Sequence, residues 1–222
     1  MIYEIFRVIG VILGWPLQFL FFKRKTYYED KKSVNLYKGG KLIVCNHYNM
    51  FDYVLGCFIV FPRKLYAVAS EVPFRSPIVR FGMKFFGAIE ANRETRSMKF
   101  LNESAAVLKK GHLVQIFPEG QNTPDGKIHD FYAGYVLIAH RGNVPIVPII
   151  TDGNYGLFKR VSVIIGKEIN VQDFMTSGKK NPTREEIEKV NEYVHQKCLE
   201  LREELEVRKA KKGKKTKKDE VV

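Results

Sequence analysis

The stretch Lys41–Asp52, KLIVCNHYNMFD, decides the fold. Its first part, Lys41–Cys45, is a short apolar run typical of a buried strand. Asn46, His47 and Asp52 then follow within seven residues. In open α/β sheets, reactive loops gather at the carboxyl ends of the strands. We therefore expect a strand over 41–45, a polar turn with candidate catalytic groups, and a helix over 51–60.

The rest of the chain repeats this alternation of apolar runs and helical patterns. Further strands are predicted at 65–70, 88–91, 112–117, 145–150 and 161–166. Further helices are predicted at 73–86, 98–110 and 135–140, and a last helix opens at Thr183 with Glu186 as its capping-box partner. Residues 23–40 are expected to be a polar linker. The pattern predicts an α/β fold with a mostly parallel sheet flanked by helices.

The N-terminal residues 1–25 are expected to form a membrane-anchoring helical segment. Residues 5–22, IFRVIGVILGWPLQFLFF, carry one charge, and a basic cluster, 23–25, follows at once. A full span needs about 20 apolar residues, and Pro16 and Gln18 interrupt this run, so the segment either spans the bilayer or lies in one leaflet. A soluble core helix is the alternative. The basic cluster predicts that the remaining chain lies on the cytoplasmic face.

The charge of the chain favours anionic partners. The formal net charge is +13, and the excess is concentrated near the C-terminus. We expect a globular domain over 26–206 and a disordered Lys-rich tail over 207–222. Phospholipid head groups, nucleic acid and acidic carriers all fit the charge.

The three cysteines form no CxxC pattern, which predicts a reducing compartment and no structural zinc.

His47 and Asp52 form a candidate base and orienting carboxylate. Their spacing across a turn into a helix allows the carboxylate to fold back onto the imidazole, as in the corresponding half of a hydrolase triad. The alternative is that Asp52 only caps the helix. The sequence holds no GxSxG elbow. Cys45 lies on the same strand face as His47, which leaves a Cys–His pair open. A base without an enzyme nucleophile favours direct deprotonation of a substrate hydroxyl.

Two more polar clusters follow apolar strands. Arg93, after the 88–91 strand, offers a planar fork for phosphate or carboxylate. Phe117 and Pro118 end the 112–117 strand, Glu119 places a charge at its tip, and Gly120 allows close approach of the backbone to a ligand. Taken singly, these are also compatible with a surface arginine and an ordinary turn. Because the strands are parallel, we expect the clusters to converge on one edge.

Together, four blocks of the sequence resemble the PlsC-type glycerolipid acyltransferases. NHYNMFD is similar to their NHxxxxD block, GAIEANR to G-x-I-x-x-x-R, FPEG to FPEG, and VPIVPI, 144–149, to the proline-containing fourth block. The resemblance spans roughly residues 40–170. It implies His47 as general base and Asp52 as its orienting carboxylate. Arg93 and the group Phe117, Pro118, Glu119 and Gly120 are implied to bind the acceptor.

The resemblance also implies the reaction and its partners. A fatty acyl group passes from acyl-CoA or acyl-carrier protein to the hydroxyl of a lysophospholipid, with 1-acyl-glycerol-3-phosphate giving phosphatidic acid as the leading case. No metal, other cofactor or nucleic acid is implied, and membrane phospholipids are expected partners. Pro145 and Pro148 are implied to be structural parts of the acyl-donor side. The sequence does not indicate the oligomeric state.

The departures from the family pattern concern the acceptor. Asn92 stands where an Asp is common, and Gln121, Asn122 and Thr123 replace the usual Thr-Arg-Ser. A different lysolipid acceptor is therefore one alternative. A thioesterase or hydrolase using Cys45 or activated water is a second. A basic nucleic-acid-binding protein is the third, and it would need aromatic and basic residues interleaved on an exposed face.

Overall fold

The computed structural model describes residues 23–91, 98–178 and 181–219, together with residues 5, 9, 10, 12–14 and 16. Its centre is a seven-stranded sheet in the order β1-β7-β6-β2-β5-β3-β4. All neighbouring strands are parallel except the pair β6 and β7. The strands are β1 (Lys25–Tyr28), β2 (Lys41–Cys45), β3 (Leu65–Ser70), β4 (Ala88–Ala91), β5 (Leu113–Ile116), β6 (Ile146–Thr151) and β7 (Ser162–Ile165).

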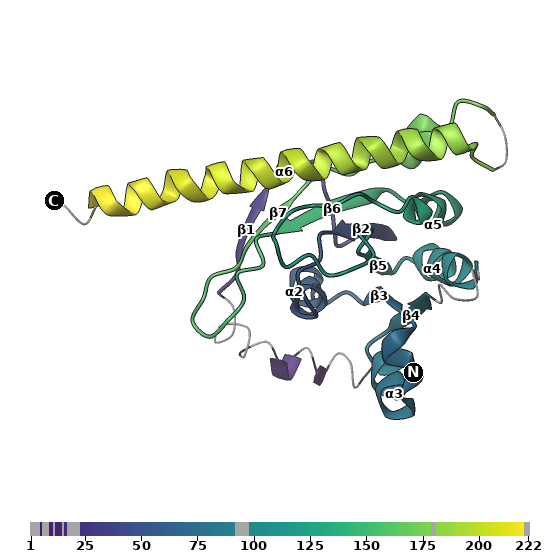
Figure 1. Ribbon diagram of the computed structural model, residues 1–222, viewed down its shortest axis with the longest axis horizontal. Helices are drawn as coiled ribbons and strands as arrows, with labels where there is room; N and C mark the ends of the chain where they lie inside the picture. The colour runs from purple at the N-terminus through teal and green to yellow at the C-terminus, as the bar shows by residue number, and fades with distance from the viewer. Residues whose placement is uncertain are drawn as a thin grey trace.

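Helices cover both faces of the sheet. One face is covered by α2 (Phe51–Val60), and the other by α4 (Lys99–Lys109), α5 (Gly134–Gly142) and the long α6 (Arg184–Asp219). Figure 1 shows α6 running across the top of the view and α2 on the opposite side of the sheet. The 3₁₀ turn η1 (Val72–Arg75) and α3 (Pro77–Phe85) connect β3 to β4, and a second 3₁₀ turn, η2 (Val171–Phe174), precedes α6.

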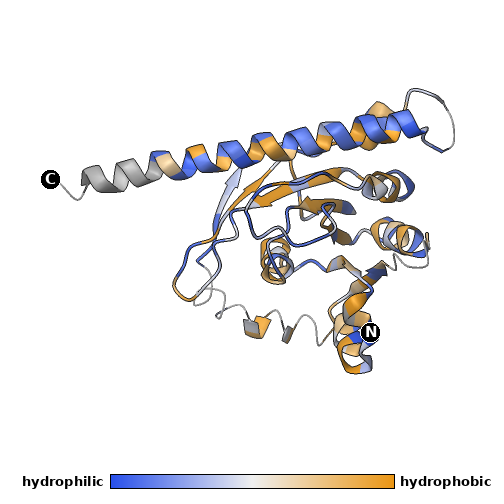
Figure 2. Ribbon diagram, viewed as in Figure 1, coloured by the Kyte–Doolittle hydropathy of each residue, from blue (hydrophilic) through white to orange (hydrophobic). Residues whose placement is uncertain are grey.

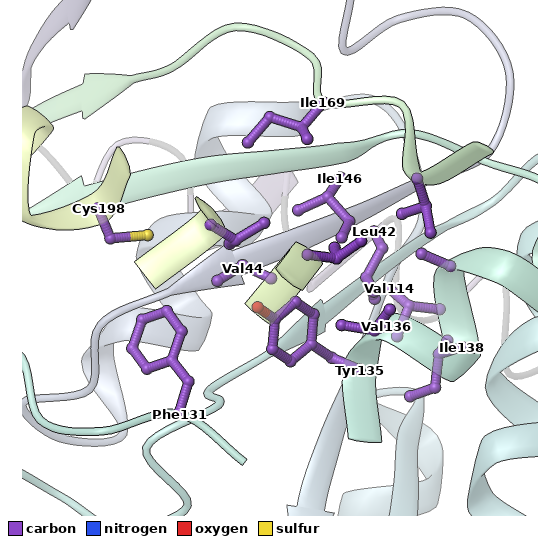
Figure 3. Packing of buried hydrophobic residues seen from close by; sticks show 14 of the residues in the cluster. Leu42, Val44, Val114, Phe131, Tyr135, Val136, Ile138, Ile146, Ile169 and Cys198 are labelled. Atoms are coloured by element: carbon purple, nitrogen blue, oxygen red, sulfur yellow. The ribbon is translucent and has the colours of Figure 1, made fainter. Parts of the chain in front are cut away.

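Strand alternation divides the core into two layers. Leu42 and Val44 of β2 point to the α4–α5–α6 side, and Ile43 points to the α2 side. Figure 3 shows the first layer, where Tyr135 of α5 and Cys198 of α6 approach Leu42 and Val44. All five residues of β2 are buried, because this central strand has neighbours on both edges and helices on both faces.

Most predicted elements are confirmed, and β2, α2, β3 and β4 have the predicted bounds. The predicted helix over 73–86 is wrong in detail, since Ser76 separates η1 from α3 and has an extended backbone. The linker prediction for 23–40 missed β1. That strand has the sequence KTYY and is only partly buried, so it lacks the apolar run of the others and forms by pairing with β7 at the sheet edge.

The C-terminal prediction is also corrected. Residues 207–219 are helical, as the end of α6, where a disordered tail was expected. Ion pairs at helical spacing support the described part of this segment, with Glu204 paired to Arg208 and Glu206 to Lys209. Lys209 also lies 3.0 Å from the carboxylate of Asp152, which ties the helix to the end of β6.

The predicted anchoring segment, 1–25, falls mostly outside the described residues. Those that are described between 5 and 16 are helical. Within the described ranges, no helix is both long and apolar enough to cross a membrane.

The predicted capping box at the start of α6 is confirmed. The Glu186 carboxylate accepts hydrogen bonds from the backbone N–H and hydroxyl of Thr183 and from the same two groups of Ser177. The Thr183 hydroxyl in turn accepts from the Glu186 N–H at 3.3 Å. These hydrogen bonds, led by the Thr183 and Ser177 backbone amides, lower the pKa of Glu186 to about 2.

This carboxylate predicts a pH dependence of stability. A carboxyl group whose pKa is depressed on folding stabilises the fold above its unfolded pKa, and this stabilisation is lost as the pH falls towards its folded pKa. We expect Glu186→Gln to lower the urea midpoint at pH 7, and the difference from the wild type to shrink between about pH 4.5 and 2. A difference that stays constant over this window would contradict the assignment. Glu185→Gln, one residue earlier on the same turn, is the matched control.

Candidate active site

The loops after β2, β5 and β6 meet at one edge of the sheet. β2 lies between β5 and β6 and is parallel to both, so the carboxyl ends of all three strands point the same way. His47 follows β2, Phe117–Gly120 follows β5, and Asp152–Tyr155 follows β6. The convergence of the first two loops was predicted. The third loop was not expected to contribute.

His47 and Asp52 are hydrogen-bonded through Nδ1 and Oδ2 at 3.0 Å. The Asp52 side chain is fully buried, whereas that of His47 is 20% exposed. A carboxylate at Nδ1 holds the proton there and leaves the lone pair on Nε2. The pair is therefore arranged as a general base with its orienting carboxylate, and the imidazole is open to a ligand.

Asp52 accepts hydrogen bonds from four donors, which fixes the orientation of its carboxylate. Besides His47, Oδ2 accepts the backbone N–H groups of Tyr48 at 2.7 Å and Asn49 at 2.8 Å. Oδ1 accepts the hydroxyl of Tyr155 at 2.5 Å. The backbone of the NHYNMFD turn thus folds around the carboxylate of its last residue, Asp52. The predicted alternative, in which Asp52 serves only the helix start, does not describe this geometry.

Tyr155 is the residue that sequence reasoning missed. It lies 103 residues after Asp52 in the chain, in the β6–β7 loop, and its ring approaches Phe51 with 5.8 Å between centroids. Burial, together with the negative charge of Asp52, raises the pKa of the Tyr155 hydroxyl. The hydroxyl therefore stays protonated and donates to the carboxylate. No motif in the sequence marks this tyrosine as a partner of Asp52.

The backbone of His47 is held from the β5 side. Its N–H donates to the Glu119 carboxylate at 3.1 Å, and its C=O accepts both the N–H and the hydroxyl of Thr123, at 2.7 and 3.0 Å. The His47 ring stacks on Phe117, with 3.9 Å between centroids. The second oxygen of Glu119 accepts the N–H of His129. Glu119 is buried, so in this structure it braces two loops.

Asn46 fastens the same turn to β6. Its side-chain amide donates to the C=O of Thr151 at 3.0 Å and its side-chain oxygen accepts the Thr151 N–H at 2.9 Å. These two hydrogen bonds continue the pairing of β2 with β6, with the Asn46 side chain in place of a backbone partner. Arg202 of α6 donates to the same Thr151 C=O. The turn after β2, residues 46–52, is therefore held on both sides, by the loop after β5 through Glu119 and by β6 through Asn46.

Cys45 is placed unfavourably for nucleophilic attack. It is buried, its thiol is 3.9 Å from the side-chain oxygen of Asn46, and burial raises its pKa well above the ordinary value. A thiol attacks as its thiolate, so this environment opposes the Cys–His pair that the sequence left open.

The remaining predicted residues divide into two groups. Pro118 and Gly120 border a cavity of about 460 Å³, whose lining includes Phe117, the ring that stacks on His47. Arg93 and the neighbouring Asn92 lie outside the described residues. The cavity is lined mainly by apolar side chains, contributed by Val68, Ala91, Met98, Phe100, Leu101, Ile116, Phe117, Tyr132, Tyr135 and Leu137.

Comparison with known proteins identifies the family. The model of the family described as Acyltransferase matches residues 19–152, which is more than half of the chain. The chain belongs to this family. This confirms the resemblance inferred from the four sequence blocks, and the matched range contains the turn after β2 and the loop after β5.

Curated relatives have consistent names. The chain is 26% identical over 173 residues to a 1-acyl-sn-glycerol-3-phosphate acyltransferase of Bacillus subtilis, with 76% of this chain and 84% of that protein covered. It is 26% identical over 158 residues to an enzyme of the same name from Cocos nucifera, with 69% and 50% covered. The chain thus spans most of the bacterial relative and about half of the plant one.

A solved structure supports the fold. The chain superposes on the crystal structure of the 1-acyl-sn-glycerophosphate (LPA) acyltransferase PlsC from Thermotoga maritima with a TM-score of 0.54. The superposition covers 88% of this chain and 77% of that one, at 19% sequence identity. The predicted class, a mostly parallel sheet flanked by helices, is therefore shared.

The Tyr155 hydrogen bond can be tested by Tyr155→Phe, which keeps the ring and removes the hydroxyl. Loss of a hydrogen bond to a charged group should lower the turnover of acyl transfer roughly 10–100-fold. Tyr53→Phe is the control, since that hydroxyl donates to the backbone carbonyls of Leu65 and Phe86. A wild-type rate for Tyr155→Phe would refute the role.

Proposed function

We propose that this protein transfers a fatty acyl group from acyl-CoA or acyl-carrier protein to the free hydroxyl of a lysophospholipid. The observation that carries the proposal is the hydrogen-bonded pair of His47 and Asp52, with Nε2 left for a substrate. The leading acceptor is 1-acyl-glycerol-3-phosphate, which would give phosphatidic acid, since the curated relatives carry that activity in their names.

The mechanism requires only one base. Nε2 of His47 takes the proton of the acceptor hydroxyl while the hydroxyl oxygen attacks the carbonyl carbon of the acyl thioester. The new C–O bond gives a tetrahedral intermediate, and its C–S bond then breaks. The proton held on His47 passes to the leaving thiolate, so that the products are the ester and the free thiol. Asp52 stabilises the imidazolium while it carries that proton.

The cavity beside the turn that carries His47, residues 46–52, supports a long-chain acyl substrate. It is bordered by Phe117, which stacks on His47, and extends among apolar side chains towards α4 and α5. Hydrophobic linings with a few polar groups at one end are typical of sites for extended apolar ligands. We propose that an acyl chain lies here, with its reacting end next to His47.

For the acceptor head group we propose Arg93 as a phosphate contact, on the strength of the sequence motif. Glu119 and Gly120 were predicted to assist. Glu119 directs both carboxylate oxygens to backbone amides, which supports a positioning role. Gln121, Asn122 and Thr123 replace the usual residues of the family, so another lysolipid acceptor is the alternative substrate.

We also propose that the enzyme works at the cytoplasmic surface of a membrane. Its substrate would be a bilayer lipid, and a reaction at its hydroxyl requires the catalytic edge to approach the head groups. The apolar N-terminal run and the net charge of +13 support this location.

The central prediction concerns His47. We expect His47→Ala to lower acyl transfer roughly 10²–10⁴-fold, because the variant lacks the general base. The measurement is transfer of a labelled acyl group from a thioester to a panel of lysolipids in detergent micelles. Cys45→Ala is the control and should keep most of the activity. Near-full turnover of His47→Ala would exclude the mechanism, and loss of turnover in Cys45→Ala alone would favour a thioesterase-type nucleophile.

A further inference from the structure

Three segments that are far apart in the sequence surround α2. Gly14 of the N-terminal run lies against Phe58, since a Cβ atom built on this glycine would be 3.4 Å from that ring. Tyr53 donates its hydroxyl to the C=O of Phe86, directly after α3. On the third side, Phe51 approaches Tyr155 of the β6–β7 loop. Figure 1 shows the described N-terminal residues, α3 and this loop below the sheet, on the side away from α6.

The β6–β7 loop ends in an exposed apolar turn. Lys159 N–H donates to the C=O of Gly156 at 3.0 Å, which closes a turn with Leu157 and Phe158 at its tip. These side chains are 55% and 65% exposed. Phe158 has a φ of +63°, a conformation that turns normally reserve for glycine or asparagine. Phe158 thus adopts a strained backbone conformation while it stays exposed to solvent.

The turn is held in place by its flanks. Lys23 N–H donates to the C=O of Lys159 at 2.9 Å, so the turn lies where the N-terminal run enters the domain. The Asn154 side chain donates to the C=O of Arg160 at 3.0 Å. Two residues before the tip, Tyr155 donates to Asp52. Any surface that binds Leu157 and Phe158 therefore lies close to His47 and Asp52.

The helix α3 presents a second apolar surface. None of its residues is buried, although Ile78 and Phe81 are large and apolar, with 86% and 61% of their surface exposed. Figure 2 shows hydrophobic and hydrophilic residues interleaved along this short helix. An amphipathic helix that buries no residue in its own domain is typical of one that lies in a bilayer interface.

The charges beside both surfaces are cationic. Lys159 and Arg160 follow the apolar tip, and Arg75, Arg80 and Lys84 lie on or beside α3. The segments 72–87 and 153–161 contain neither Asp nor Glu. Apolar side chains next to cations match a surface with an apolar interior and anionic head groups.

We propose that the turn Leu157–Arg160 and α3 dock this protein on an anionic phospholipid bilayer, with Leu157 and Phe158 inserted below the head groups. The proposal deepens the proposed function and rests on it for the lipid nature of the substrate. The docked loop carries Tyr155, so the membrane contact and the hydrogen bond to Asp52 belong to the same loop.

The first test measures partitioning of the full-length protein onto vesicles of phosphatidylcholine, alone or mixed with phosphatidylglycerol. The variant Leu157→Ser/Phe158→Asn removes the apolar tip, and asparagine keeps the turn because it tolerates positive φ. We expect partitioning at least about tenfold weaker than that of the wild type on mixed vesicles. Lys159→Gln/Arg160→Gln should cost roughly fivefold per charge on mixed vesicles and nothing on neutral ones. Tyr193→Ser, on the exposed side of α6, is the matched control.

A second variant reports on insertion even if the N-terminal run alone holds the protein on the vesicle. In a Trp15→Phe background, Phe158→Trp should show a blue-shifted emission on mixed vesicles and quenching by brominated lipid. Tyr193→Trp in the same background should show neither. An unchanged emission of Phe158→Trp on vesicles that carry the protein would overturn the proposal. Concentration-dependent dimerisation abolished by Leu157→Ser/Phe158→Asn would assign the surface to a second copy of the chain instead.

Acyl transfer in detergent micelles separates this proposal from the proposed function. If Leu157→Ser/Phe158→Asn transfers acyl groups in micelles like the wild type but partitions less onto vesicles, both stand. If the wild type acylates no lysolipid while Phe158→Trp still inserts, the proposed function fails and the docking surface stands.

Discussion

The hydrogen bonds to the Asp52 carboxylate are the interaction on which the site depends. Oδ2 accepts hydrogen bonds from the His47 imidazole and from two backbone amides of the same turn. Oδ1 accepts one from the hydroxyl of Tyr155, which lies in another loop. A buried carboxylate is tolerated only when its lone pairs are satisfied. The need to satisfy this one charge therefore shapes the turn after β2 and couples it to the loop after β6.

The sheet explains why these donors can meet. β2 is the central strand, with β5 on one side and β6 on the other, so the three loops leave the same edge as neighbours. Glu119 reaches the His47 backbone from one side, and Asn46 reaches Thr151 on the other. Because both contacts are hydrogen bonds to backbone groups, the position of the imidazole is tied to the sheet itself.

Sequence reasoning predicted the elements well where the physical signal is local. Apolar runs bounded by glycine or proline mark β2, β3 and β4, and the Thr183–Glu186 pair marks the start of α6. It failed at β1, where a polar edge strand has no such run, and at 207–219, where i,i+3 and i,i+4 ion pairs and a contact with Asp152 continue the helix. At β1 the stabilising neighbour is β7, which a local pattern does not contain. At 207–219 the ion pairs are local, but the contact of Lys209 with Asp152 is not.

The sequence by itself determined the α/β class, through its alternation of strand and helix patterns. It also determined the pair of His47 and Asp52, through their spacing in one turn, and the membership of an acyltransferase family, through four short blocks in order. The tertiary structure decided what surrounds that pair. Tyr155 donates to Asp52 from 103 residues further along the chain, and Thr123 donates to the His47 carbonyl. Burial raises the pKa of the Cys45 thiol, which opposes its use as a nucleophile. These contacts join loops that only the order of strands in the sheet brings together, and no one-dimensional pattern encodes that order directly.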